Sequence, residues 1–347
     1  MHKYLRKVFL FYLAFIFPIN LIAGIIPKGE TNLNLVSPLV VLQEKDTSYT
    51  KRYSLAKLFF EKEDYTNSLK QTLSLLNEIE NKNYRELEYL SNFLIGDIFR
   101  KRNNHDKALS YFKKSLYILE NKQDFNVDEL RVLDKLFDKD RSFAQTFLRI
   151  GGEYYKLNKK DSAAIYFKKI IETPSLNNFP QTKASSYTNL SGIYLEKSNF
   201  DLAREYALKA VKINKLNNNK LSESSALNNL ASIYLVEKKY AEAKKIYIEA
   251  IDLIKNDESV VAIKNKEDLY YNLAYVLYMQ KDYKAYEYLD QSYVYKDTLT
   301  DREIKRIVKG VYAEYQEQYK VELVKNQVAL KEAEEKKTAW FFGILSF

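Results

Sequence analysis

The sequence predicts an all-α protein, built as an array of about six helical hairpins and followed by one long C-terminal helix. Three observations lead to this prediction. Glycine and proline are scarce, with 8 and 5 among 347 residues, which leaves few breakers for a strand-rich or loop-rich fold. The stretch "LNNLASIYLVEKKYAEA", which begins at Leu227, has a near-copy that begins at Tyr187, "YTNLSGIYLEKSNFDLA". Between Gly310 and Lys337 no other glycine and no proline interrupts the chain.

The amino-acid composition argues against several kinds of function. The formal net charge is +9, but lysines alternate with glutamates along the helices as on a solvated surface, so we expect no direct nucleic-acid contact. Cysteine is absent, which excludes disulfides, thiol catalysis and cysteine-based metal sites. The 30 tyrosines and 19 phenylalanines are expected to anchor the packing between helices.

The first 26 residues have the pattern of an export signal. A basic start with Lys3, Arg6 and Lys7 precedes an apolar run from Val8 to Phe17 that continues to Ile26. Residues 1–26 are therefore predicted to be a signal peptide or an uncleaved N-terminal anchor, and no well-defined cleavage site decides between the two.

The array is predicted from a repeated register of small and aromatic residues over residues 43–295. In the clearest copy, Ala231 is followed by Tyr234, Tyr240, Ala243 and Tyr247. Small residues let two antiparallel helices approach closely where they cross, and the aromatic side chains fill the space beside the crossing. The six copies centre on small residues separated by 40, 55, 40, 40 and 43 positions: Ala56, Gly96, Gly151, Ser191, Ala231 and Ala274.

Two of the copies depart from the common spacing. The interval of 55 residues predicts an insertion near residues 122–140, in "KQDFNVDELRVLDKLFDKD". The sixth copy has Tyr283 in the aromatic position but the bulky Tyr286 where a small residue is expected. Pro174 and Pro180 fall between two repeats, as expected of helix terminators.

The ladder "ASIYLVEKKYAEAKKIYIEA" resembles the tetratricopeptide repeat, in a long form of about 40 residues. The resemblance implies a right-handed α-α superhelix in which the first helix of each pair lines a groove. The large aromatic residue that this family carries early in the first helix is mostly missing, since Arg52, Asn92 and Leu227 occupy that position in three copies.

No catalytic, metal-binding or cofactor-binding pattern is present in the sequence. The histidines are His2, in the predicted signal, and His105, which stands in the aromatic position of its repeat and is expected to be a packing residue. Glycine spacing gives neither a phosphate-binding loop nor a dinucleotide fingerprint. We therefore predict a non-enzymatic protein without a cofactor.

A set of asparagines is the candidate binding site. Asn189, Asn229 and Asn272 stand two residues before the small residue of three successive repeats. The motif resembles the long-repeat branch of the family found in kinesin light chains, which implies that such amides hold the backbone of a bound peptide. The alternative is that the same amides bridge neighbouring helices within the stack. The complete candidate groove comprises Asn189, Asn229, Asn272, Asn228, Ser185 and Ser225.

Residues 298–337 are predicted to form a helical stalk. Apolar residues at Ile304, Val308, Val311 and Tyr315 follow a coiled-coil spacing, which would allow a homodimer through this helix. The last residues, 338–347, are apolar and begin with a tryptophan, as transmembrane helices often do. They are interpreted either as the start of a membrane span or as a tail that packs on a neighbour.

Signal, array, stalk and apolar end together resemble the extracytoplasmic half of Bacteroidetes-type membrane-bound regulators. This resemblance implies an exported sensor that binds a protein or peptide ligand outside the cytoplasm and contacts the membrane through its terminal apolar segments. One alternative is a secreted or periplasmic scaffold that assembles partners without signalling. Another is a peptide-responsive cytosolic regulator.

Overall fold

The computed structural model describes residues 49–80, 82, 84–121 and 138–345, and all regular structure in these ranges is helical. The predicted all-α class is thereby confirmed for the described residues. The helices are α2 (Tyr49–Glu61), α3 (Tyr65–Ile79), α4 (Arg85–Lys101), α5 (His105–Asn121), α6 (Lys139–Lys156), α7 (Lys160–Glu172), the short 3-10 helix η3 (Pro174–Asn178), α8 (Pro180–Glu196), α9 (Phe200–Leu216), α10 (Lys220–Val236), α11 (Tyr240–Ile254), α12 (Val260–Met279) and α13 (Ala285–Leu345).

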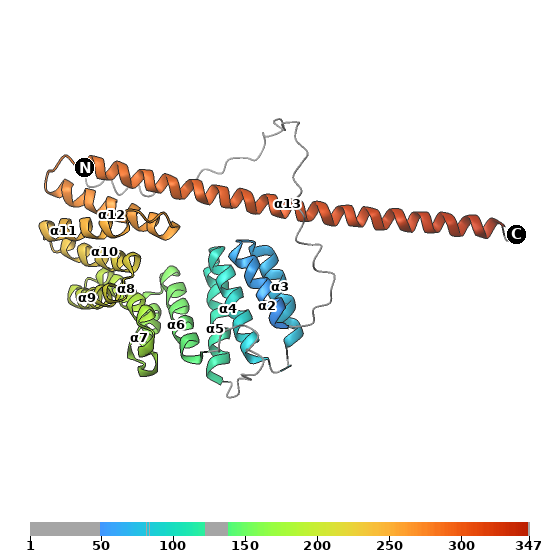
Figure 1. Ribbon diagram of the computed structural model, residues 1–347, viewed down its shortest axis with the longest axis horizontal. Coiled ribbons are helices and arrows are strands. Elements are labelled where there is room, and N and C mark those ends of the chain that lie inside the picture. The colour runs from blue at the N-terminus through green and yellow to red at the C-terminus, as the bar shows by residue number, and fades with distance from the viewer. Residues whose placement is uncertain (1–48, 81, 83, 122–137, 346–347) are drawn as a thin grey trace. The chain divides into compact units, whose positions relative to one another are not determined.

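The helices pack as six antiparallel pairs in chain order, from α2 with α3 to α12 with α13 (Figure 1). Each second helix also packs on the first helix of the next pair, which makes the array continuous. Pro174 opens η3 and Pro180 opens α8, so both prolines separate two pairs as predicted. The predicted N-terminal signal lies outside the described residues, as does most of the predicted insertion near residues 122–140.

The small residues lie at the helix crossings, as their register predicts. Ala203 and Ala243 are fully buried. At Gly96 an added Cβ would lie 2.6 Å from the ring of Phe112, and at Gly151 the same distance from the ring of Phe167. At these two crossings the aromatic ring occupies the volume that an alanine methyl group would need, so the glycines are required for close approach.

The turn inside each pair has one recurring backbone conformation. The seventh residue after each small residue has a positive φ, for example 63° at Lys238. The next amide then bonds to the carbonyl five residues earlier, as Lys239 N does to Tyr234 O at 2.8 Å. The residues in this conformation are Glu63, Asn103, Asn158, Ser198, Lys238 and Lys281.

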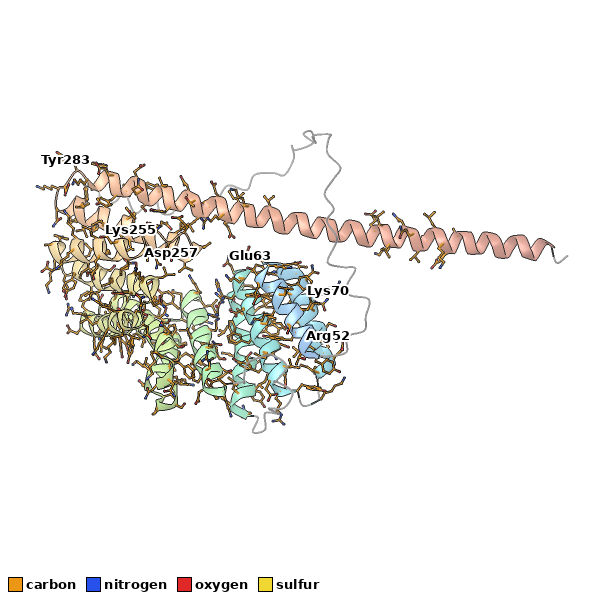
Figure 2. The ribbon with its side chains drawn as sticks, viewed as in Figure 1. Arg52, Glu63, Lys70, Lys255, Asp257 and Tyr283 are labelled. Atoms are coloured by element: carbon orange, nitrogen blue, oxygen red, sulfur yellow. The ribbon has the colours of Figure 1, made fainter. Side chains whose placement is uncertain are left out.

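The sixth pair corrects the predicted register of its second helix. Tyr286, assigned to the small position, is 69% exposed, and Ala285 is buried in its place. Tyr283, assigned to the aromatic position, lies in the turn between α12 and α13 and is 87% exposed (Figure 2). A tyrosine does not fit a crossing that accepts alanine in sister repeats, so the helix packs one residue out of step.

α13 is one continuous helix, so the second helix of the sixth pair and the predicted stalk are a single element (Figure 1). Its side chains are described for residues 285–305, 308 and 322–333. Within this part Ile304, Val308, Val324 and Val328 are at least half exposed. Among the residues that the structure describes, no helix combines the length and the apolar character that crossing a membrane requires.

The core is a chain of neighbouring apolar clusters along the array. One cluster surrounds Tyr53 in the first two pairs, and another surrounds Tyr247 in the last pairs. Clusters around Phe112 and Phe167 lie between them in the sequence. Because each cluster involves only adjacent pairs, the stability of the array depends on contacts between neighbours.

Candidate functional site

The first helices of the pairs form a common surface. α2 contacts α4, and α6, α8, α10 and α12 contact one another in succession, whereas second helices of neighbouring pairs make no comparable contact in the described residues. The first helices therefore lie closer together than the second helices, and their side chains line the inner side of the stack. We call this surface the first-helix face.

The predicted asparagines lie on this face and are half-buried, but they do not behave alike. Asn229 Nδ2 donates to the backbone carbonyl of Thr188 on the preceding first helix at 2.8 Å. Asn272 Nδ2 donates to Asn228 Oδ1 at 3.2 Å, again between two first helices. Asn189 Nδ2 donates within its own helix, to Ser185 O at 2.8 Å. Two of the three amides thus bridge neighbouring repeats, which was the alternative interpretation.

The predicted serines belong to the same row of contacts. Ser225 Oγ donates to Leu221 O at 3.1 Å and accepts a bond from Asn265 Nδ2 at 2.6 Å. Ser185 Oγ donates to Gln181 O at 3.0 Å within α8. Amide and hydroxyl groups therefore connect α8, α10 and α12 in a ladder, and the part of it that remains exposed is polar and uncharged.

A cationic cluster lies on the first-helix face between the second and third pairs. Arg100 Nε donates to Asp97 Oδ1 at 2.9 Å. Arg149 Nε lies 2.9 Å from the same oxygen without making a directed hydrogen bond, and its guanidinium group lies 6.0 Å from the ring centroid of Phe93. Asp97 is 12% exposed, whereas the Arg100 and Arg149 side chains are 30% and 36% exposed.

The sequence did not predict this cluster. The available signal was positional: Asp97 stands one residue after its small residue, where Gly152, Gly192 and Ser232 stand in later repeats. An added Cβ at Gly152 would have no atom within 4 Å, so the face is open beside the cluster.

Exposed aromatic side chains cover the last part of the face. Tyr271, Tyr275 and Tyr278 on α12 are 53%, 47% and 58% exposed. Their spacing of four and three residues places them on one side of the helix. Tyr271 and Tyr275 stand in the register of Asn228 and Ser232 one repeat earlier. The tyrosines of the chain were predicted only as packing anchors, so this exposed stripe was not expected from the sequence.

Tyr155 lies on the same face, between the cationic cluster and the asparagines. Its hydroxyl group donates to the carboxylate of Glu196 on the next first helix. Burial, together with this carboxylate, raises the pKa of Tyr155 to about 12. The phenol is therefore neutral at physiological pH and acts as a hydrogen-bond donor.

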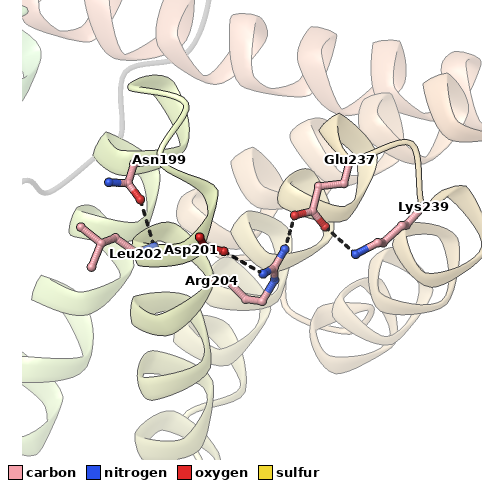
Figure 3. A network of polar contacts seen from close by, with 6 residues as sticks. All are labelled: Asn199, Asp201, Leu202, Arg204, Glu237 and Lys239. Carbon is pink, nitrogen blue, oxygen red and sulfur yellow. Dashed lines mark hydrogen bonds and ion pairs between the residues drawn. The ribbon is translucent and has the colours of Figure 1, made fainter.

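Ion pairs at the hairpin turns hold successive repeats together. Arg204 on α9 contacts the carboxylate of Glu237 at the end of α10, and Lys239 Nζ reaches the same group at 3.0 Å (Figure 3). Lys244, in the register of Arg204, pairs with Asp282 at 3.5 Å. Because these charges neutralise each other within the stack, we assign them to repeat packing.

His105 also contacts the next repeat. Its Nδ1 lies 2.7 Å from Glu153 Oε2, and Glu153 is 3% exposed. The histidine fills the aromatic position of its repeat, as predicted, but its main contact is polar.

A surface cavity lies away from the predicted residues. It has a volume of about 730 Å³ and is lined by side chains of α3, α4 and α5, including Asn77, Glu88, Lys113 and Tyr117. In the part of the chain that the structure covers, no three histidine, aspartate or glutamate side chains are grouped as metal ligands.

Comparison with known proteins finds the tetratricopeptide repeat in three stretches of the chain. Models of the tetratricopeptide repeat match residues 182–256, 89–121 and 144–173. No curated protein matches the sequence. The solved structure of RapI in its apo form is similar over 76% of this chain and 99% of its own, with 12% identity and a TM-score of 0.55. The structure of NprR in complex with its cognate peptide NprX is similar over 78% of this chain and 74% of its own, with 14% identity and a TM-score of 0.54.

Proposed function

Since the chain is a tetratricopeptide-repeat protein, we propose that it is a non-enzymatic module that binds an extended peptide, or an extended segment of a protein, on its first-helix face. One observation carries the proposal: this face presents a row of half-buried amide and hydroxyl groups, flanked by partly exposed arginines and exposed tyrosines. Amides can donate and accept, as a peptide backbone requires. NprR, which shares the fold, was solved with a peptide.

A blocking substitution tests the proposed surface. The chain is used to select binders from a displayed library of random decapeptides, and the selected peptides are titrated against Gly152→Trp. The open space above Gly152 would accept the indole without disturbing the packing, so we expect an unchanged melting temperature and at least a tenfold loss of peptide affinity. Lys245→Trp, on the exposed side of α11, is the matched control. Recovery of no binding peptide, or equal binding by Gly152→Trp, would contradict the proposal.

We further propose that the module is the extracytoplasmic sensory part of a membrane-bound regulator. The basic and apolar pattern of residues 1–26 and the apolar residues 338–347 support this assignment. The test is a fusion of residues 1–46 to a reporter enzyme that is active only outside the cytoplasm. An inactive reporter would favour the cytosolic alternative, and an exported array released from the membrane would favour the scaffold.

Self-association through α13 is part of this proposal. The exposed apolar residues Ile304 and Val308 lie about one turn apart on α13, as do Val324 and Val328, and each pair presents apolar surface to a second copy of the helix. Light scattering on the purified chain would then give twice the monomer mass, and Val324→Glu with Val328→Glu would return it to the monomer. A monomeric wild-type chain at micromolar concentration would contradict self-association.

A further inference from the structure

The first-helix face changes its chemistry from one end to the other while the register of the repeats stays the same. In the second to sixth repeats, the residue that follows the small position is, in order, Asp97, Gly152, Gly192, Ser232 and Tyr275. One charged side chain is thus followed by two glycines, then by a polar side chain and finally by an aromatic one. A surface with this order can distinguish the two ends of an extended ligand.

The cationic end carries an excess of positive charge. Arg100 and Arg149 share the single carboxylate of Asp97, so the cluster has a net charge of +1. Each guanidinium group turns its Nε toward Asp97, which leaves its four terminal N–H groups for other acceptors. Because Arg149 is held by charge without a directed bond, it can turn toward an incoming carboxylate and keep its contact with Phe93.

The opposite end favours apolar groups. Tyr271, Tyr275 and Tyr278 expose about half of their surface in a row along α12, with Asn272 beside them. Aromatic rings of this kind contribute large contact areas at low cost in side-chain entropy. The exposed part of this row carries no formal charge.

We propose that the ligand is an extended peptide with a carboxylate at one end and aromatic or aliphatic side chains at the other, bound with its acidic end at Arg100 and Arg149. This inference rests on the proposed function and adds the composition and direction of the ligand. Packed helices lie about 8–10 Å apart, so the three steps from α6 to α12 span roughly 24–30 Å. An extended chain advances about 3.3–3.6 Å per residue, so the two groups are separated by roughly seven to nine residues.

The selection described above supplies the probe for this inference. Peptides enriched by the wild-type chain are expected to combine aspartate or glutamate with Phe, Tyr, Trp or Leu at that separation. When the library is selected on the Arg149→Gln variant, the enriched peptides are expected to lose the acidic position and keep the apolar one. Selection on the Tyr275→Ser variant should give peptides that keep the acidic position and lose the apolar one. Affinity of an enriched peptide, measured by fluorescence anisotropy, should fall at least about tenfold in Arg149→Gln, because a charge-assisted hydrogen bond is lost.

Matched variants separate binding from folding. Arg149→Lys keeps the charge and should restore most of the affinity, whereas Lys245→Gln and Tyr117→Ser remove a cation and an exposed phenol from second helices and should leave it unchanged. Melting curves confirm that each variant is folded. If no peptide is enriched, the proposed function itself fails. If peptides are enriched without the acidic and apolar pattern, or with a pattern that Arg149→Gln and Tyr275→Ser do not change, the proposed function stands and this inference is overturned.

Discussion

The Asn229 side chain belongs to the proposed peptide-binding face and also forms a hydrogen bond between two repeats. Its amide nitrogen already donates to Thr188 O across two repeats, so we expect Asn229→Ala to leave that carbonyl without this donor and to lower the free energy of unfolding by about 1 kcal/mol. Asn189→Ala is the matched control, because the Asn189 amide bonds to a carbonyl of its own helix. Thermal melts of the two variants measure the difference. Equal midpoints would show that the bridge contributes nothing.

Asn214 is a second residue whose side chain can be tested alone. It is fully buried in α9, and neither its Oδ1 nor its Nδ2 has a hydrogen-bond partner in the described structure. Sister repeats place Ile79, Leu119 and Ile254 at the same position. We expect Asn214→Leu to raise the free energy of unfolding by about 1–3 kcal/mol, because burial of an amide without partners is unfavourable.

Urea unfolding of Asn214→Leu measures this effect directly. The exposed Asn217, the C-cap residue of the same helix, provides the control: its amide bond to Ile213 O lies at the surface, so Asn217→Leu should change stability by less than about 0.5 kcal/mol. A destabilised Asn214→Leu variant would mean that the amide is satisfied in solution.

At the scale of the helix, replacing Gly96 or Gly152 by alanine should change the stability of the protein in opposite directions. Gly96→Ala forces a methyl group to within 2.6 Å of Phe112 and should cost about 1–3 kcal/mol through overpacking. Gly152→Ala meets no atom within 4 Å and should stabilise α6 by about 0.5–1 kcal/mol, because alanine loses less backbone entropy in a helix. Chemical unfolding of both variants tests the pair, and a stabilised Gly96→Ala would refute the crossing geometry.

At the scale of the element, the sequence predicts those features that depend only on side chains within one hairpin. Ala203 and Ala243 reveal their crossings because side-chain size within one hairpin sets the approach of its helices. The repeat pattern fades near residue 298, but α13 continues through this position, because a fading repeat pattern is no helix breaker. The one-residue shift that buries Ala285 depends on whether Tyr286 fits the helix crossing, and the repeat register does not contain this information.

The candidate site was only partly predictable for a related reason. The asparagines were found because they recur at one position, but Asn229 finds its acceptor 41 residues away, on a neighbouring helix. The pairing of Arg149 with Asp97 likewise joins different positions of different repeats. Single charged residues that occur in one repeat produce no periodic signal, so the cluster appears only once the stack is built.

At the scale of the whole molecule, alkaline pH should weaken the array in its first and fifth pairs. Burial raises the pKa of Tyr53 in the first pair and of Tyr247 in the fifth well above the usual tyrosine value. A raised pKa means that the folded state holds its proton more tightly than the unfolded state does. The associated stability is therefore complete below about pH 10, the pKa of an exposed tyrosine, and is lost as pH rises toward the folded-state values.

The measurement is the midpoint of urea unfolding between pH 8 and pH 11, followed by circular dichroism. Tyr247→Phe removes one buried phenol and should flatten the decline above pH 10, although it also removes the 2.9 Å contact with Ser232 and so lowers stability at neutral pH. Tyr278→Phe, at an exposed position, should leave the slope unchanged. Lysine deprotonation affects all three chains equally, so the difference between slopes isolates the phenol. Because each repeat is stabilised by its neighbours, loss of the cluster around Tyr247 should destabilise the adjacent pairs as well, and equal slopes in all three proteins would contradict this account.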